Sequence, residues 1–591
     1  MKINKRIERL RKEMVENSID YYIIPSEDAH QSEYVPEYYR GRAYISGFTG
    51  SAGTLLLGRE KGILWTDGRY FIQAEKELEG SGIEMFKMRI PGWPTLLEWL
   101  TDNIKEGETI GFDGKTISVE EFKGYSKLAE EKLLKIKLEK DLLEKVWIDR
   151  PELPKEKIFI HEVKYAGKGR KEKINEVRNE MSKLDVDSYI IASLDDIAWL
   201  FNLRGNDVKN NPVFLSYAIV ESDRVTLFID LDKVDNSVRK TLEEDEITLK
   251  DYNDILEDVR NLQGKVLIDE NKVSAMVRTN LLDEVEVIEK LNITTTLKAI
   301  KNDIEIENLK KCQVKDGIAM VKFMKWLKEN IVKGSISEIS AAEKIKEFRS
   351  ELALFKGTSF DSICAHKEHG AMMHYSATKD SNYNLESKGF LLLDSGGQYL
   401  DGTTDITRTF ILGDLTEEER KDFTLVLKSH INLLRTRFLK GISGSNLDIK
   451  ARQPLWDEGI DYKCGTGHGV GFFLNVHEGP QSISPVPNKV ALEPGMILTN
   501  EPGVYRKGKH GIRTENTMLV VKDIKDEEFG EFYKFQVISY CPIDLDGIDK
   551  ELLSKEERNW LNEYHKETYD KISEFLTEDE KEFLKKYTKA L

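Results

Sequence analysis

Short apolar runs alternate with amphipathic stretches along the first part of the chain. Residues 20–26 (DYYIIPS), 54–58 (TLLLG) and 62–71 (GILWTDGRYF) are rich in aromatic and branched side chains, which is typical of strands. Residues 5–18 (KRIERLRKEMVENS) and 94–107 (PTLLEWLTDNIKEG) repeat apolar positions at helical spacing and end at turn-forming residues. Strands and helices in alternation predict an α/β fold.

The pattern of this region returns once in the same chain. The sequence DSYII beginning at Asp187 echoes DYYII beginning at Asp20, and each follows a stretch with helical periodicity. Two similar α/β domains are the simplest account of such an internal repeat. We place the first domain at residues 1–158 and the second at residues 159–302.

The sequence changes character near Asp303. A long helical pattern precedes a glycine-rich stretch with many strand-like runs, which predicts an α+β domain at residues 303–530. Residues 531–591 form a C-terminal extension with a charged, helical tail. The apolar face of this tail consists of Trp560, Leu561, Tyr564 and Tyr569. That face would pack on the body of the protein or on a second subunit.

Composition narrows the classes of function. The 591 residues include 105 acidic and 88 basic side chains, a formal net charge of −17 without a basic stripe, which argues against nucleic acid as the main partner. No apolar run approaches the roughly 20 residues of a membrane span, and the N-terminus lacks the apolar segment of a secretory signal. The four cysteines lie far apart, which argues against disulfides and zinc–thiolate sites. We therefore expect a cytoplasmic protein.

Two aspartates near the middle of the third region are the first candidates for chemistry. Asp394 ends an apolar strand, and Asp405 opens a second strand-like stretch, DITRTFIL. A hairpin that turns at Tyr399-Leu400 would make the two aspartates direct cross-strand partners on one face. Two carboxylates held so close repel each other, and a divalent cation between them would remove the problem.

Three further residues complete a candidate ligand set. His468 lies in GTGHGVG, Glu501 follows the strand-like GMILTN, and Glu515 lies in an alternating strand-like run, IRTENTMLVV. Four carboxylates and one imidazole suit two hard divalent cations, most of all Mn²⁺, with Co²⁺ or Zn²⁺ as possible replacements. Arg513 would share a strand face with Glu515 and could orient the carboxylates.

The motifs around these residues resemble those of metallopeptidases with the pita-bread fold. Within that group the chain is similar to the long, three-domain X-prolyl aminopeptidases (aminopeptidase P), and the resemblance covers nearly the whole sequence. The matching motifs include SGFTGSAGTLLL, LWTDGRYFIQA, SLDDIAWLFNLRGNDVKNN, GTSFDSI, LLLDSGGQYLDGTTDITRT, GTGHGVGFFLNVHEGP and NEPGVY. The resemblance implies two N-terminal domains of the creatinase/prolidase type, a pita-bread catalytic domain and a cytosolic enzyme that acts as a homodimer.

The resemblance also implies roles for individual residues. The metal ligands of the family fall on Asp394, Asp405, His468, Glu501 and Glu515. The histidines that handle substrate fall on His374 and His477, and an arginine near the mouth of the site falls on Arg42. Two cations about 3.5–4 Å apart would share a water and lower its pKa, and Glu501 would accept the proton of that water. The expected reaction is hydrolysis of the bond between an N-terminal residue and a penultimate proline.

One segment departs from the family pattern. Residues 365–370 (AHKEHG) carry two additional histidines, His366 and His369, where a polar loop is expected. We interpret both as solvated loop residues, with a place in the lining of the active-site cleft as the alternative.

Three alternatives keep the same fold. A prolidase would cut only X–Pro dipeptides, but the chain length and the duplicated α/β region favour an aminopeptidase. A creatinase-like amidinohydrolase lacks the metal set, so the intact ligands from Asp394 to Glu515 disfavour it. A non-catalytic binding module that has lost the ligands is disfavoured for the same reason.

Overall fold

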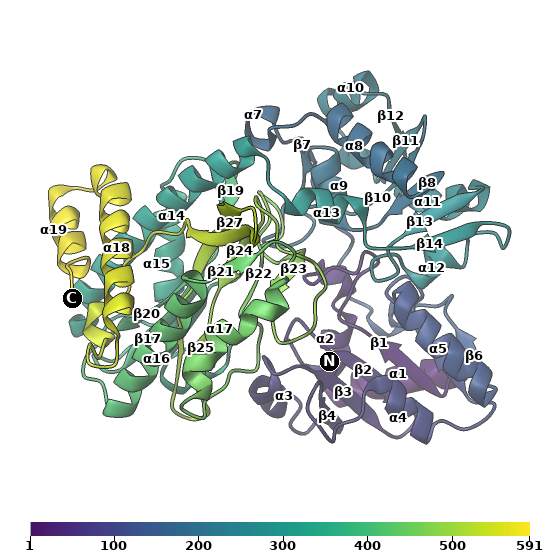
Figure 1. The fold of residues 1–591 in the computed structure, drawn as a ribbon. Coiled ribbons are helices and arrows are strands. Elements are labelled where there is room, and N and C mark those ends of the chain that lie inside the picture. Colours follow the sequence, from purple (N-terminus) through teal and green to yellow (C-terminus); the bar gives the residue numbers. More distant parts are fainter. Residues whose placement is uncertain (1) are drawn as a thin grey trace. The chain divides into compact units, whose positions relative to one another are not determined.

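A computed structural model describes residues 2–591 (Figure 1). The chain forms two compact units. The first comprises the residues up to Val163 together with Lys168–Thr296, and the second comprises Lys164–Gly167 and Leu297–Leu591. Within residues 2–591, none of the helices combines the length and the apolarity that are needed to cross a lipid bilayer.

The first unit contains two six-stranded sheets. The first sheet has the order β4 (Ile83–Lys87), β3 (Gly62–Thr66), β2 (Thr54–Gly58), β1 (Tyr21–Ile24), β5 (Thr109–Gly111) and β6 (Lys135–Lys137). The second has the order β12 (Ile247–Lys250), β11 (Val225–Ile229), β10 (Ser216–Glu221), β8 (Ser188–Ile191), β13 (Lys265–Ile268) and β14 (Glu286–Glu289). Helices such as α1 (Ile3–Glu16) and α8 (Arg170–Lys183) turn apolar faces towards these sheets.

The two sheets confirm the predicted repeat of α/β domains. The repeated motif forms β1 in the first sheet and β8 in the second, and both strands occupy the same place in the strand order. β1 pairs antiparallel with β2 and parallel with β5, while β8 pairs antiparallel with β10 and parallel with β13. The boundary at residues 158/159 stays a prediction.

The long helix α14 (Asp303–Asn330) lies near the start of the main segment of the second unit. Asn302 caps it, because its side-chain oxygen accepts hydrogen bonds from the backbone nitrogens of Ile304 and Glu305, while the Glu305 carboxylate accepts from the backbone nitrogen of Asn302. The expected start of the third region near Asp303 therefore coincides with a capped helix.

Two sheets form the framework behind the site. One contains β16 (Ile363–His366), β17 (Phe390–Ser395) and β20 (Ile406–Ile411). The other has the order β21 (Arg437–Leu439), β28 (Gly530–Val537), β27 (Asn516–Asp526), β24 (Ile497–Asn500), β22 (Gly467–Gly469) and β23 (Glu478–Ile483). They meet where the Thr517 hydroxyl donates to the Asp405 carbonyl at 3.0 Å and the Glu515 amide donates to the Thr407 carbonyl at 3.1 Å.

The register of β17 and β20 differs from the prediction. Asp394 pairs with Thr407, not with Asp405, and the turn falls at Leu400-Asp401 because Tyr399 pairs with Gly402. Gly402 follows this turn, and it approaches α14 so closely that a Cβ there would lie 2.9 Å from the Leu309 side chain, which favours glycine at this position. Asp405 is consequently a diagonal neighbour of Asp394, two residues from its partner and on the same face.

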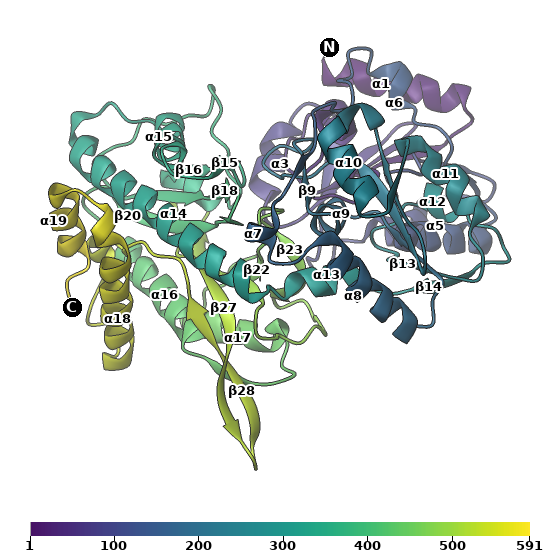
Figure 2. The ribbon, with the colours of Figure 1, turned by 90° about the horizontal axis from the view of Figure 1, so that it is seen from above.

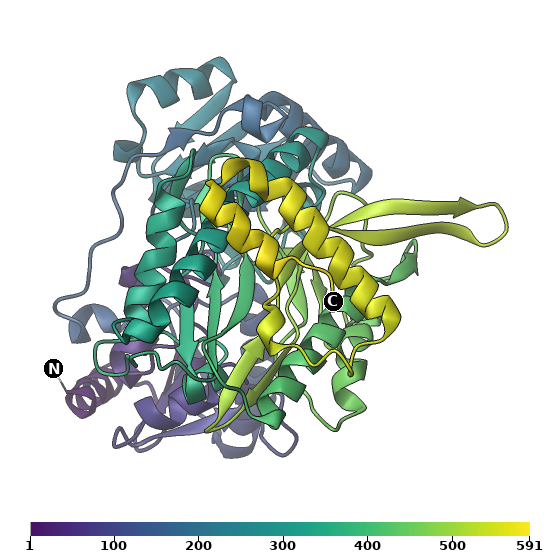
Figure 3. The same ribbon diagram turned by 90° about the vertical axis from the view of Figure 1, so that its left-hand side faces the viewer.

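The C-terminal extension packs on its own chain. Its helices α18 (Lys555–Ile572) and α19 (Glu578–Tyr587) lie against α14, and α18 also contacts α16 (Glu417–Leu434) (Figure 3). Leu561 and Tyr564 join the apolar core of the second unit. The tail was expected to pack on the body of the protein or on a second subunit. In the structure it packs on the body of the protein. The far ends of β27 and β28 extend from this unit as a long hairpin (Figure 2).

Candidate metal centre

The five predicted ligands come from the ends of strands in the two framework sheets. Asp394 lies in β17, Asp405 precedes β20, His468 lies in β22, Glu501 follows β24, and Glu515 precedes β27. Glu515 was expected inside a strand, but it occupies the two-residue junction between β26 (His510–Arg513) and β27. The main-chain bond from Glu515 to β20 holds this junction at the contact between the sheets.

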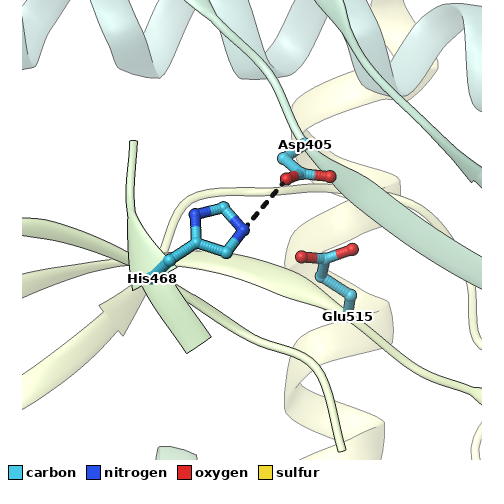
Figure 4. Close-up of side chains that lie close together, drawn as sticks. All are labelled: Asp405, His468 and Glu515. Carbon is cyan, nitrogen blue, oxygen red and sulfur yellow. Dashed lines mark ion pairs between the residues drawn. The ribbon is translucent and has the colours of Figure 1, made fainter. Parts of the chain in front are cut away.

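Three of these side chains form a tight group (Figure 4). One ligand atom from each of Asp405, His468 and Glu515 lies within 4.8 Å of the other two. His468 Nε2 lies 3.4 Å from Asp405 Oδ2 and 3.5 Å from Glu501 Oε1, which adds a fourth ligand candidate. His468 Nδ1 lies 2.8 Å from the carbonyl oxygen of Gly469. This contact leaves Nε2 to face the carboxylates.

Arg513 connects Asp394 to the rest of the site. Its Nη2 donates to Asp394 Oδ2 at 2.6 Å, its Nε donates to the Thr407 hydroxyl at 3.2 Å, and its Nη1 donates to the Tyr505 hydroxyl at 2.7 Å. Because the guanidinium takes up one carboxylate oxygen, it fixes the direction in which the other oxygen of Asp394 points.

Thr407 is a site residue that the sequence analysis missed. Its hydroxyl donates to Glu515 Oε2 at 2.7 Å and thereby orients the carboxylate. The sequence did contain a sign of this role. Thr407 follows Asp405 by two positions in a predicted strand, and residues two apart in a strand share a face.

When no cation is bound, burial and the neighbouring charges favour the protonated forms of the ligand side chains. Burial raises the pKa of Asp394 to about 7 against the pull of Arg513, and burial together with neighbouring carboxylates raises the pKa of Glu501 and raises that of Glu515 far more. Burial of His468 opposes its charge, but the hydrogen bond with Asp405 and the charge of Glu501 raise its pKa to about 9. The site therefore holds excess negative charge that protons or cations must neutralise.

The chemistry of the donor set fits metal ions. Asp394 Oδ1 and Asp405 Oδ1 are buried and have no hydrogen-bond partner, which is costly for carboxylate oxygens. Four carboxylates and one imidazole converge there, and divalent cations with a preference for oxygen supply the missing partners. The residues that are present thus suit a centre of more than one cation.

Of the two substrate-handling candidates of the second unit, His477 lies beside this group, and His374 follows a residue that is hydrogen-bonded to Arg513. The His477 ring stands edge-on to the His468 ring, with the ring centroids 4.3 Å apart. His374 follows Met373, whose carbonyl accepts a hydrogen bond from Arg513 Nη2 at 3.3 Å. Both histidines are partly buried, and their roles stay predictions.

Arg42 lies in the first unit, in the short helix α2 (Gly41–Ser46). Its guanidinium is buried and donates to the carbonyls of Phe48, at 2.9 Å, and Gly50. These bonds stabilise the loop that follows α2. A role of Arg42 in substrate binding stays a prediction.

The interpretation of His366 and His369 as solvated residues is wrong. His366 ends β16 and is fully buried, with Nδ1 2.8 Å from the Phe390 carbonyl oxygen. His369 is 5% exposed, and its Nδ1 lies 2.9 Å from Glu338 Oε1. The segment is buried because β16 pairs with the central strand β17, which turns a supposed loop into the interior of the domain.

A buried arginine supports the site from the other face of β20. Arg408 Nη1 donates to the Glu515 carbonyl at 2.6 Å, and Nη2 donates to Asn516 Oδ1 at 2.8 Å and to the Tyr564 hydroxyl at 2.7 Å. The carbonyl of Cys541 accepts from Nη2 at 2.8 Å. Arg408 thereby joins a predicted metal ligand to α18 in the C-terminal extension.

Family comparisons cover almost the whole chain. Residues 6–143 and 149–305 each match the creatinase/prolidase N-terminal domain. Residues 307–522 match metallopeptidase family M24, and residues 531–591 match the C-terminal region of the same peptidases.

Individual relatives match over nearly their full lengths. Xaa-Pro aminopeptidase 1 of Dictyostelium discoideum is 42% identical over 588 residues, which span 96% of this chain and 93% of the relative. A probable Xaa-Pro aminopeptidase P of Pyrenophora teres f. teres is 40% identical over 97% of this chain and 90% of its own length. The crystal structure of X-prolyl aminopeptidase from Caenorhabditis elegans, described as a cytosolic enzyme with a di-nuclear active site, matches with a TM-score of 0.96 and 32% identity over 100% of both chains.

Proposed function

Because this chain belongs to the Xaa-Pro aminopeptidases of metallopeptidase family M24, we propose that it removes the N-terminal residue from peptides whose second residue is proline. The observation that carries the proposal is the convergence of ligand atoms from Asp405, His468 and Glu515 within 4.8 Å. Buried carboxylates that repel one another are costly in a surface that only binds a partner, whereas a metallohydrolase needs them.

The proposed cofactor is a pair of divalent cations, with Mn²⁺ first and Co²⁺ or Zn²⁺ as replacements. The residues that would hold them are Asp394, Asp405, His468, Glu501 and Glu515. When bound, such a pair supplies Lewis-acid polarisation and a water nucleophile that is active near neutral pH.

The protein's own groups would then orient and move protons. Arg513 and Thr407 fix one oxygen each of Asp394 and Glu515, so that the ligand set is arranged before substrate arrives. Glu501 lies at the rim of the group, where its carboxylate can accept the proton of the attacking water.

The two histidines would act on the substrate. His477 and His374 can donate hydrogen bonds to the oxygen that becomes negative when the carbonyl is attacked, or to the departing proline nitrogen. Protonation of that nitrogen matters because an unprotonated amide nitrogen is a poor leaving group.

Substrate length separates this proposal from a prolidase. We expect an X–Pro–Y tripeptide to be cleaved at the X–Pro bond at least about tenfold faster, in kcat/KM, than the X–Pro dipeptide, a difference of about 1.4 kcal/mol in transition-state free energy. The measurement is steady-state hydrolysis of both peptides by the Mn²⁺-loaded protein. Cleavage of the dipeptide alone would reverse the assignment to prolidase.

Alanine variants of His477 and of the neighbouring His468 are expected to differ in the metal that they bind. His477→Ala should lower kcat by about 100-fold, the scale of a lost proton-transfer group, and leave bound metal unchanged. The matched control is His468→Ala, which should lose metal although the two rings lie only 4.3 Å apart. Metal content by mass spectrometry and peptide hydrolysis test both variants, and loss of metal from His477→Ala contradicts the proposed role.

A binding module without catalysis remains the alternative from another class. Purified protein without bound Mn, Co or Zn, and without activity after these ions are added, would support it. The proposed partners are proline-containing peptides and a second copy of the chain, and the proposed location is the cytosol.

A further inference from the structure

Glu338 gathers four hydrogen-bond donors in the interior of the second unit. It begins α15 (Glu338–Ser350), which lies beside β16 (Figure 2), and it is fully buried. Its carboxylate accepts from the backbone nitrogens of His366 and Tyr383, both at 2.8 Å. It also accepts from the Tyr375 hydroxyl at 2.9 Å and contacts His369 Nδ1 at 2.9 Å. A buried carboxylate is stable only with such partners, so the four groups are held together tightly.

His369 adds a second layer to this cluster. Its ring is stacked between two tyrosines, with the ring centroids 4.3 Å from Tyr375 and 3.9 Å from Tyr383 and interplanar angles of 25° and 24°. The hydroxyls of the two tyrosines differ in their partners. That of Tyr375 reaches Glu338, whereas that of Tyr383 donates to Glu368 at 2.9 Å.

His374 lies between two anchored residues. On one side, the Met373 carbonyl accepts from Arg513 Nη2, the same nitrogen that holds Asp394 Oδ2. On the other side, Tyr375 is fixed by Glu338 and by its stacking on His369. The segment that carries His374 is therefore tied to the metal centre at one end and to α15 at the other.

We propose that Glu338 and His369 are positioning residues for His374. They hold Tyr375, and Tyr375 sets the backbone direction from which the His374 side chain reaches the substrate. This inference rests on the proposed role of His374. Catalytic groups must be held within about 0.5 Å of their productive place, and a misplacement of about 1 Å can cost about 100-fold in rate. The ring of His369 and the backbone nitrogen of His366 thus belong to the support of the site.

A matched pair of variants tests the proposal. Tyr375→Phe keeps the ring on His369 and removes the hydroxyl from Glu338, while Tyr383→Phe keeps the other ring and removes a hydroxyl that does not reach Glu338. With the Mn²⁺-loaded protein, Tyr375→Phe should lower kcat about tenfold, with Mn²⁺ affinity and KM changed less than twofold. Tyr383→Phe should stay within twofold of the wild type in all three.

The Tyr375 hydroxyl also donates to the Ser381 carbonyl at 3.1 Å, so Tyr375→Phe removes this bond as well. A second variant therefore removes the contact with Glu338 and leaves Ser381 in place. Glu338→Gln should reproduce the loss in kcat, because an amide cannot accept from four donors. Its control is Glu343→Gln, an exposed position on the same helix, which should match the wild type.

A double-mutant cycle separates positioning from general support of the fold. In the His374→Ala background, Tyr375→Phe should add less than a twofold loss, because its effect passes through His374. An undiminished tenfold loss in that background would overturn the inference and make the cluster merely structural. A wild-type rate for Tyr375→Phe beside an impaired His374→Ala would overturn the inference alone. A wild-type rate for His374→Ala would overturn the proposed role of His374 and, with it, the inference.

Discussion

Asp405→Ala is expected to lower kcat by about 1,000-fold or more and to release bound metal while the chain stays folded. The turnover is lost because Asp405 belongs to the tight group with His468 and Glu515, and its removal takes away carboxylate oxygens that would bind metal. The fold survives for three reasons. Asp405 Oδ1 has no partner, and the Asp405 carbonyl keeps the bond from Thr517. Burial raises the pKa of Glu515 most, and removal of one negative charge relieves the repulsion from Asp405 that raises it further.

Peptide hydrolysis, metal content and thermal melting of the metal-free protein test this expectation together. The matched control is Asp401→Ala, a buried aspartate in the preceding turn that binds Lys315 at 2.7 Å and lies outside the ligand set. It should keep full metal content. Normal turnover and normal metal content in Asp405→Ala would remove Asp405 from the site.

The affinity for Mn²⁺ is expected to rise steeply with pH. The pKa of Asp394 is raised to about 7 and that of His468 to about 9, so both groups hold protons in the metal-free site below these values. A cation binds their deprotonated forms and must displace those protons. Each displaced proton changes affinity by about tenfold per pH unit, so the Kd should fall by at least about 100-fold between pH 6 and pH 8.

Titration calorimetry with the metal-free protein in two buffers of different ionisation enthalpy measures the affinity and the number of protons released. Asp394→Asn is the matched variant, because an amide has no proton to lose in this range. It should bind more weakly at pH 8 and show a shallower dependence on pH below 7. A Kd that stays constant from pH 6 to pH 8 would contradict the charge balance described for the site.

The strongest sequence signals were those that repeat or that interrupt a pattern. The echo between Asp20 and Asp187 predicted two similar sheets, because a repeated hydrophobic pattern buries the same faces twice. The change near Asp303 predicted a long helix, which the structure shows as α14. The positions of the five candidate ligands were predicted from glycine-rich motifs and from resemblance to a family.

Contacts between distant segments could not be predicted in the same way. The pairing of Asp394 with Thr407 is a contact across the sheet, and the close approach of Gly402 to α14 is a second contact that only tertiary packing reveals. The burial of His369 depends on Glu338, which lies 31 positions away. Polar residues in a short loop-like segment look solvated until the partner that neutralises them is known.

The position of Arg408 has a consequence for how this protein can be divided. Excision of a minimal catalytic fragment at residue 530 would split the β27–β28 hairpin and remove Cys541 and Tyr564, two of the groups that accept from this guanidinium. A buried cation deprived of acceptors would draw water or rearrange, and the Glu515 carbonyl that it holds would move with it. Proteolytic removal of the tail would thus inactivate the enzyme through Arg408 and Glu515, although no residue that contacts the peptide is cut.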